Sequence, residues 1–146
     1  MEKIRVEKEN VYQIEVNDKG EYIEFDLLDI DLPMKLMNGA EELKKQKRIY
    51  KNKLIALNKQ YKDNQRMLLF KQYDLDKEFC TKLRSVFDGF LGEGACQKIF
   101  GNVDRIGMFD AFFEQLSPHL DKLVINVEQI KNNLYEKYNP NKKEVI

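Results

Sequence analysis

The chain has 146 residues, the length of one ordinary domain, and a domain of this size buries about two thirds of its unfolded surface on folding. Its 25 basic and 25 acidic residues cancel, so no overall field draws it toward nucleic acid or an anionic membrane. Two cysteines and a single histidine argue against a structural metal or a histidine-based triad, and no apolar run approaches the roughly 18 residues that span a bilayer. We expect one compact cytoplasmic unit, with no cofactor, metal or membrane segment.

Charge is balanced in sum but uneven along the chain. Residues 1–31 carry ten acidic and four basic side chains, whereas residues 41–66 carry nine basic and three acidic side chains. The chain is therefore dipolar, and opposite patches on one subunit favour head-to-tail association into rings or open spirals.

Period-two alternation of apolar residues predicts two strands near the N-terminus, over 11–16 and 21–27. The residues between them, "NDKG", are typical of a tight turn, because Asn17 can bond its own backbone and Gly20 can take positive φ. A lone hairpin is marginal in water, so its apolar face must pack on another surface.

The apolar period then becomes helical. Pro33 suits the first position of a helix, and a spacing of three and four predicts a long amphipathic helix from there to about residue 70, unless Gly39 marks its true start. In this interpretation Asn64 is a polar interruption of the apolar stripe, and Asp74 caps a second helix that ends near "FLGEG".

The stretch "FLGEGACQKIFGN" could cradle phosphate or present a reactive thiol, but its spacing differs from a P-loop and its lysine lacks the glycine and hydroxyl neighbours. We interpret it as structural. Gly92 and Gly94 form an elbow between two helices, Gly101 stops the short second one, and Phe100 packs beneath the elbow beside Cys96, which we expect to be a buried thiol.

The last helical region has the most regular pattern, with apolar residues at alternating steps of three and four from Ile106 to Leu134. Pro118 lies off this stripe. We expect either a kinked helix or two nearly coaxial helices with Ser117 capping the second. This seam and that of the first long helix can satisfy each other as an antiparallel pair.

These elements predict a mainly α protein with an N-terminal β-hairpin (α+β), in which long amphipathic helices pack as a helical bundle. The hairpin arm comprises residues 1–31 and the helical domain residues 32–138, with residues 139–146 as a flexible tail of a single compact unit.

The basic stretch "KKQKRIYKNK" admits two interpretations. Lysines with an interleaved tyrosine on helix 44–62 could follow a phosphate backbone, which would make the protein a nucleic-acid-binding regulator. The apolar opposite face instead favours a solvated or protein-contacting surface that includes Lys47, Arg48 and Lys51. Since acidic pairs at helix and strand ends are explained by capping, no residue set indicates catalysis, and we expect a non-enzymatic binding protein.

Residues 75–125 contain, in order, a helix ending in Phe-Leu, Gly-Glu-Gly-Ala, Lys-Ile-Phe-Gly, and a Phe-rich helix closing in Gln-Leu-Ser-Pro. This order resembles small phage and prophage proteins of Gram-positive bacteria that are taken to be tail assembly chaperones of long-tailed phages. The opening "VYQIEVNDKGEYIEFDL" is similar to the start of such proteins. The resemblance implies a protein of the host bacterial cytoplasm that coats the helical tape measure protein and guides tail tube assembly around it.

A chaperone for an amphipathic helix needs an adaptable apolar groove. Met108 and Phe112 lie beside the last seam and are the residues that we expect to bind the partner, while a spiral assembly would suit the coating of a rod. The alternatives are the nucleic-acid-binding regulator and a small inhibitor or adaptor that binds a host protein.

Overall fold

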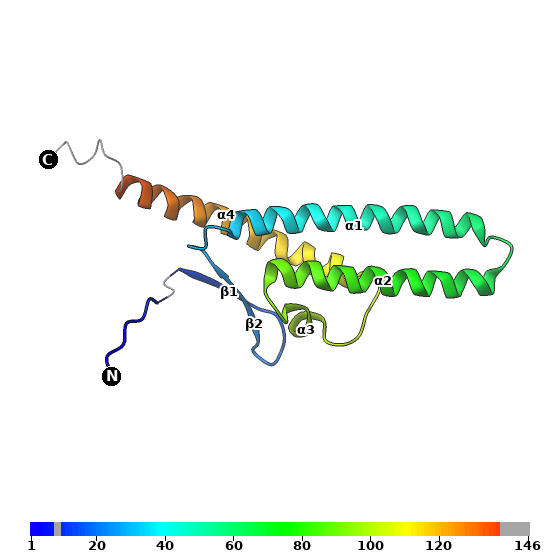
Figure 1. Ribbon diagram of the computed structural model, residues 1–146, viewed down its shortest axis with the longest axis horizontal. Coiled ribbons are helices and arrows are strands. Elements are labelled where there is room, and N and C mark those ends of the chain that lie inside the picture. Colours follow the sequence, from blue (N-terminus) through cyan, green and yellow to red (C-terminus); the bar gives the residue numbers. More distant parts are fainter. Residues whose placement is uncertain (8–9, 138–146) are drawn as a thin grey trace.

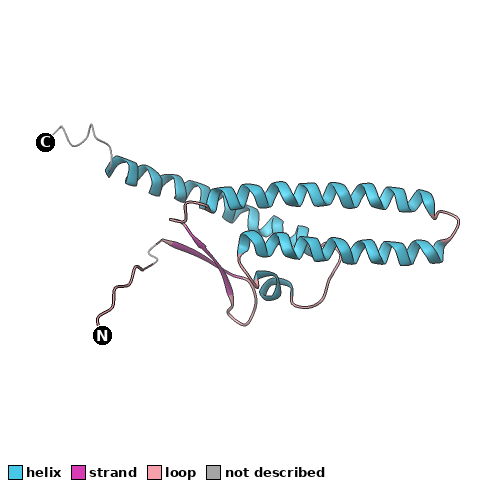
Figure 2. Ribbon diagram, in the orientation of Figure 1, coloured by secondary structure: helices cyan, strands magenta, loops and turns pink. Residues whose placement is uncertain are grey.

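A computed structural model describes residues 1–7 and 10–137. Two strands come first, β1 (Val11–Glu15) and β2 (Tyr22–Asp26), and four helices follow: α1 (Leu32–Gln60), α2 (Gln65–Leu91), α3 (Ala95–Phe100) and α4 (Met108–Lys137). Figure 2 shows the strands beside one end of the long helices. The predicted fold class, mainly helical with an N-terminal hairpin, is confirmed. The predicted tail, 139–146, lies outside the described residues.

The β-hairpin packs on the helices of its own chain. β1 and β2 are antiparallel, with Ile14 opposite Ile23, and Ile23 and Phe25 are buried in the common core. The side chain of Asn17 closes the turn by accepting from the backbone N–H groups of Lys19 and Glu21, at 2.9 and 3.2 Å. The core therefore supplies the apolar support that a two-stranded sheet lacks alone.

α1 and α2 form a long antiparallel helical hairpin (Figure 1). The prediction of one helix to about residue 70 and of a second one capped by Asp74 is wrong. α1 ends at Gln60, and Asn64 caps α2 by accepting from the N–H of Met67 at 3.1 Å, whereas Asp74 is exposed inside α2. The short turn keeps the apolar stripe in phase, so periodicity alone did not reveal it.

The elbow after α2 depends on glycine conformations. Gly92 has φ 114° and ψ 154°, and Gly94, at φ 79°, precedes the first residue of α3. Gly101, at φ 66°, follows its last residue. An L side chain rarely adopts these values, so this sharp reversal requires glycine.

α4 is a single helix that continues through Pro118. Because proline has no backbone N–H, one intrahelical hydrogen bond is missing at this position, while the apolar seam continues through it. Ile106, expected on that seam, precedes the helix and is completely exposed. Figure 1 shows α4 running antiparallel to the first part of α1, and Lys47 of α1 forms an ion pair with Asp110 at the start of α4.

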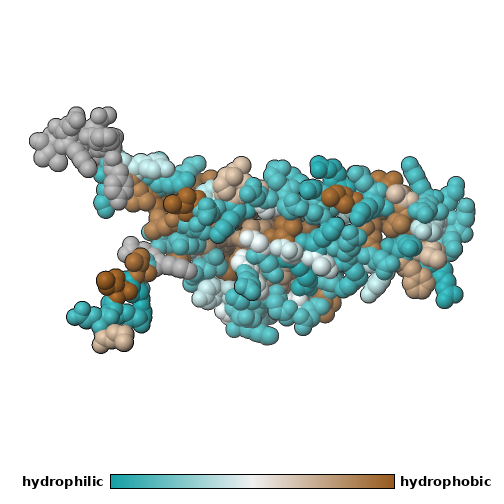
Figure 3. Space-filling model, in the orientation of Figure 1, coloured by the Kyte–Doolittle hydropathy of each residue, from teal (hydrophilic) through white to brown (hydrophobic). Residues whose placement is uncertain are grey.

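The core lies where the hairpin, the end of α2, α3 and α4 meet. Phe87 is fully buried, and its ring contacts those of Phe90, Phe100, Phe109 and Phe112, with centroids 5.3 to 6.1 Å apart. Figure 3 shows hydrophilic side chains covering most of the visible surface, with hydrophobic ones between them along the body. The far end of the α1–α2 hairpin has no third layer of helix over it (Figure 1).

Within the described residues, no helix combines the length and hydrophobicity that crossing a membrane requires.

Candidate functional site: an apolar groove beside the helical hairpin

A groove of about 440 Å³ lies between the α1–α2 hairpin and the segment 104–110 that leads into α4. Aromatic and aliphatic side chains make up much of its lining, and the charged lining residues are three of each sign. The lining consists of Lys47, Tyr50, Tyr73, Asp76, Lys77, Phe79, Cys80, Asp104, Arg105, Ile106, Gly107, Phe109 and Asp110.

A fixed aromatic pair forms the side of the groove next to α1. The rings of Tyr50 and Phe79 stack with centroids 4.4 Å apart, and the Tyr50 hydroxyl donates to Oδ1 of Asp76 at 2.6 Å. This hydrogen bond, with partial burial, raises the pKa of Tyr50 to about 12. The phenol therefore stays neutral, and keeps its donor role, to a higher pH than an ordinary tyrosine.

The opposite wall is held by Arg84 of α2. Its Nε donates to Oδ1 of Asp104 at 2.8 Å, and its terminal nitrogens donate to the carbonyl oxygens of Gly101 and Val103 at 2.9 and 3.4 Å. Lys77 also donates to Asp104. These two cations hold the pKa of the Asp104 carboxyl below its ordinary value, Lys77 having the larger effect. One guanidinium thus holds the first part of the loop between α3 and α4, residues 101–104, which is the geometry to which arginine is suited.

Charges on the groove are largely neutralised within the chain. Lys47 pairs with Asp110, and Lys77 with Asp104. Paired charges at the edge of an apolar surface contribute little affinity themselves, but they leave the aromatic lining as the main contact area. The groove is therefore suited to an apolar ligand more than to a strongly charged one.

An exposed apolar strip on α2 leads from the hairpin tip into the groove. The side chains of Leu69, Phe70 and Tyr73 are 68%, 57% and 62% exposed. At 100° per residue they lie on the same face of the helix as Lys77 and Cys80, which line the groove. From Leu69 to Cys80 this face extends about 16 Å at 1.5 Å per residue.

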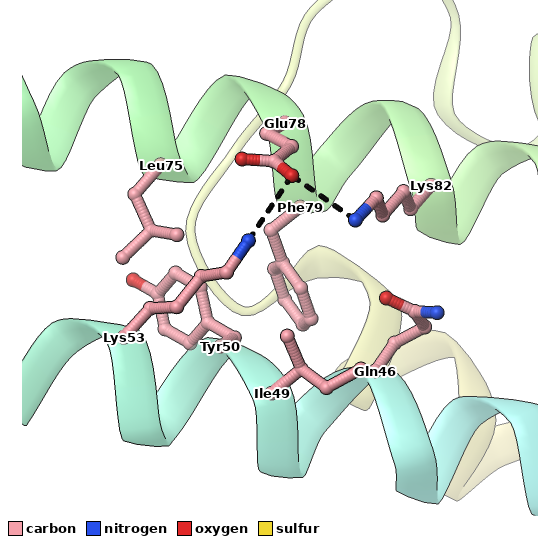
Figure 4. A pocket seen from close by; sticks show the side chains of 8 residues that line it. All are labelled: Gln46, Ile49, Tyr50, Lys53, Leu75, Glu78, Phe79 and Lys82. Atoms are coloured by element: carbon pink, nitrogen blue, oxygen red, sulfur yellow. Dashed lines mark hydrogen bonds and ion pairs between the residues drawn. The ribbon is translucent and has the colours of Figure 1, made fainter.

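A second space, on the other side of the α1–α2 contact, is too small to hold a ligand. Figure 4 shows Phe79 pointing from α2 between Tyr50 and Ile49 of α1, with Glu78 joined to Lys53 and Lys82. The cavity there has a volume of about 10 Å³. It is part of the packed contact between the two helices.

The structure separates the predicted partner-binding residues. Lys47 lies on the groove, while Arg48 and Lys51 are exposed elsewhere on α1. Phe112 is half-buried, and its ring meets that of Phe100 edge to face at 5.6 Å. Met108 packs against the core, and its sulfur accepts from the N–H of Arg105 at 3.3 Å. Both apolar residues thus pack against the core, and neither lines the groove.

Sequence reasoning missed the residues that form the open apolar surface. Ile106 was assigned to the last helical seam, and Tyr73 and Tyr50 were not expected to face one groove. A signal was present in Gly107, because a glycine directly after Ile106 can end the seam there, and its φ is 77°.

The thiols do not form a reactive site. Cys96 is 2% exposed, and its Sγ donates to the carbonyl oxygen of Arg84 at 3.3 Å. Burial, followed by the nearby Asp88 carboxylate, raises the pKa of this thiol to about 12. Cys80 is half-buried on the groove, and burial raises its pKa as well. Among the described residues, no group of three or more His, Cys, Asp or Glu could hold a metal ion.

Comparison with known families places this chain in one of them. Residues 19–145 match the "Family of unknown function (DUF6673)", which covers the end of the hairpin turn, β2 and all four helices. The chain belongs to this family. No curated protein and no solved structure matches it.

Proposed function

We propose that this protein is a non-enzymatic assembly chaperone that binds an amphipathic helix of a partner protein in the groove and along α2. The observation that carries the proposal is the continuity between the groove and the exposed strip of Leu69, Phe70 and Tyr73. A helix that presents apolar residues at i, i+3, i+4 and i+7 matches such a surface in shape and chemistry. The partner would be a long helical protein whose apolar seam aggregates if left uncovered.

The sequence resemblance suggests which partner this is. A tape measure protein of a long-tailed phage is such a helix, and the chaperone would act on it in the bacterial cytoplasm during tail assembly. The groove supports this proposal by offering aromatic contact area along its lining. Conversely, Lys47 and Lys53 are each paired with an acidic residue, which reduces the positive charge that helix 44–62 offers to nucleic acid.

Fluorescence anisotropy with a labelled model helix tests the proposal. The probe is a synthetic peptide of about 18 residues with Leu and Phe at the anchor spacing, compared with a scrambled peptide of the same composition. Ile106→Asp should weaken binding at least tenfold, because Ile106 is fully exposed on the groove and the change costs the fold little. Ile125→Asp is the matched control, since Ile125 is 55% exposed on α4 and lies off the groove.

Equal affinity for the two peptides, or equal loss in the two variants, would refute a helix-binding groove. The biological partner is then tested by co-expression with a tape measure protein from the same genetic element. Wild-type protein should keep that partner soluble and co-purify with it, whereas Ile106→Asp should not. Normal peptide binding without any effect on the tape measure protein would leave the groove in place and reject this partner.

A further inference from the structure

Residues 1–7 form an arm whose apolar side chains are exposed to solvent. Every residue of this segment is exposed, and Ile4 and Val6 are 97% and 93% exposed. Figure 1 shows the arm leading away from the helices, and Figure 3 shows hydrophobic side chains on it, clear of the body. These two β-branched residues, separated by Arg5, leave an apolar surface open for another element to cover.

The arm has the pattern of a half-buried strand. In an extended chain Ile4 and Val6 point to one side, while Lys3 and Arg5 point to the other. β-branched residues on one side and cations on the opposite side are typical of a strand with one face on a core and one in solvent.

The β-hairpin offers a free edge for such a strand. The hydrogen bonds from Val16 N–H to Glu21 O and from Leu27 N–H to Asn10 O fix the phase of the ladder. In that phase the backbone groups of Gln13 and Glu15 point away from β2, and within the described residues they form no hydrogen bond. A row of unpaired backbone groups is a template for another strand.

The other edge of the sheet is less open. Lys98 of α3 donates to the carbonyl oxygen of Tyr22 in β2, at 3.4 Å. The hairpin is also held in place by a 2.8 Å hydrogen bond between the Tyr12 hydroxyl and Nδ1 of His119, and by one from the Asn17 amide to Lys98 O at 3.0 Å. The β1 edge is therefore both free and rigidly positioned.

The two faces beside this edge match the two faces of the arm. On the inner face, Tyr12 and Ile14 pack against the core. On the outer face, Glu15 lies with Glu24 and Asp26, so that face is acidic. A third strand beside β1 would place Ile4 and Val6 next to the core and Lys3 and Arg5 next to the carboxylates, and both contacts are favourable.

We propose that the arm of one subunit adds as a third strand to the β1 edge of a second copy of this chain. The arm and the edge are different surfaces, so the contact repeats from copy to copy into a ring or open chain, or closes as a dimer if two copies exchange arms. None of these residues lines the groove, so the contact leaves the groove of every subunit open to a helical partner.

Sedimentation of the full chain over a range of concentrations is the test. The wild-type protein should self-associate. The double substitution Ile4→Asp and Val6→Asp should raise the dissociation constant at least tenfold, whereas Val124→Asp with Ile125→Asp, two aliphatic residues exposed on α4 and off the groove, should not. Peptide binding by the groove should be unchanged in all of these variants, which separates a failure of this contact from a failure of the proposed function.

Charge reversal tests the orientation of the arm. Lys3→Glu with Arg5→Glu should also weaken association at least tenfold, and Glu15→Lys added to that pair should restore part of the loss. Disulfide cross-linking between an Arg5→Cys copy and a differently tagged Glu15→Cys copy should give the mixed dimer. In the control, a Lys59→Cys copy replaces the Glu15→Cys copy, and no mixed dimer should form. A monomeric wild type, or association that ignores the arm substitutions, overturns the proposal.

Discussion

Gly39 of α1 faces the ring of Phe90 so closely that a Cβ at position 39 would lie 2.5 Å from Cδ1 of that ring. Gly39 is buried in the interior of α1, and Phe90 belongs to the end of α2 that carries the aromatic core. The absence of a side chain thus sets how closely the first turns of α1 approach the core.

Gly39→Ala should therefore destabilise the protein, although alanine is the better helix former. We expect a loss of about 1–3 kcal/mol in the free energy of unfolding by urea, because the Phe90 ring must move. Gly89→Ala is the matched control, since a Cβ there would meet no atom within 4 Å. That variant should gain up to about 1 kcal/mol from helix propensity. If Gly39→Ala were stabilised as well as Gly89→Ala, the close contact between position 39 and the Phe90 ring would be contradicted.

Asp104→Asn should loosen the loop that forms one wall of the groove. It removes the ion pairs with Arg84 and Lys77, and we expect a cost of about 1–2 kcal/mol at pH 7. Asp74→Asn, exposed on α2 without an ion pair in the described part of the chain, should change stability little.

The pH dependence of the Asp104→Asn effect has a definite sign. Because the folded protein lowers the pKa of Asp104 from 3.8, its contribution is present above pH 3.8 and is lost as the pH falls through the lowered value. Urea unfolding at a series of pH values should show the two proteins converging in acid. A difference that stays constant through this range would contradict the role of the charge.

Tyr50 should ionise late, because the hydrogen bond to Asp76 raises its pKa to about 12. Its contribution to stability is fully present below pH 10 and is lost as the pH rises toward 12. Spectrophotometric titration should show a late component that Tyr50→Phe removes. Tyr135→Phe, on an exposed part of α4, is the control that should leave it in place.

Cys96 should resist alkylation in the native state, since its thiol is buried and its pKa is about 12. Mass spectrometry after treatment with iodoacetamide should find Cys80 modified first. Cys96→Ser should cost about 1–2 kcal/mol through burial of a hydroxyl while helix binding is retained. A folded Cys96→Ser protein without binding would instead point to a functional thiol.

Helices and strands were predictable where the apolar pattern of the segment picks out the same residues that are buried in the core. The strands over 11–16 and 21–27 alternate in period two, and the same residues that alternate are those that meet the helices, such as Ile23 and Phe25. The short helix before Gly101 was predictable for a related reason, because positive φ at a helix end has a chemical signature in glycine.

The boundary between α1 and α2 was not predictable from periodicity. Tyr61 and Leu68 are seven residues apart, a spacing that a continuous helix and a helix-turn-helix in phase share. The turn over 61–64, with the cap hydrogen bond from the N–H of Met67 to Asn64, distinguishes the two.

The sequence by itself determined the fold class, the burial of Cys96 and the glycine elbow, because each follows from local stereochemistry or from an apolar pattern of fixed period. Tertiary structure decided which apolar residues remain outside. Phe112 went into the aromatic core while Ile106 stayed in solvent, although both are large and apolar. The physical reason is that exposure depends on which surfaces other elements cover, and this is set by contacts between residues far apart in the chain, such as that of Arg84 with Asp104.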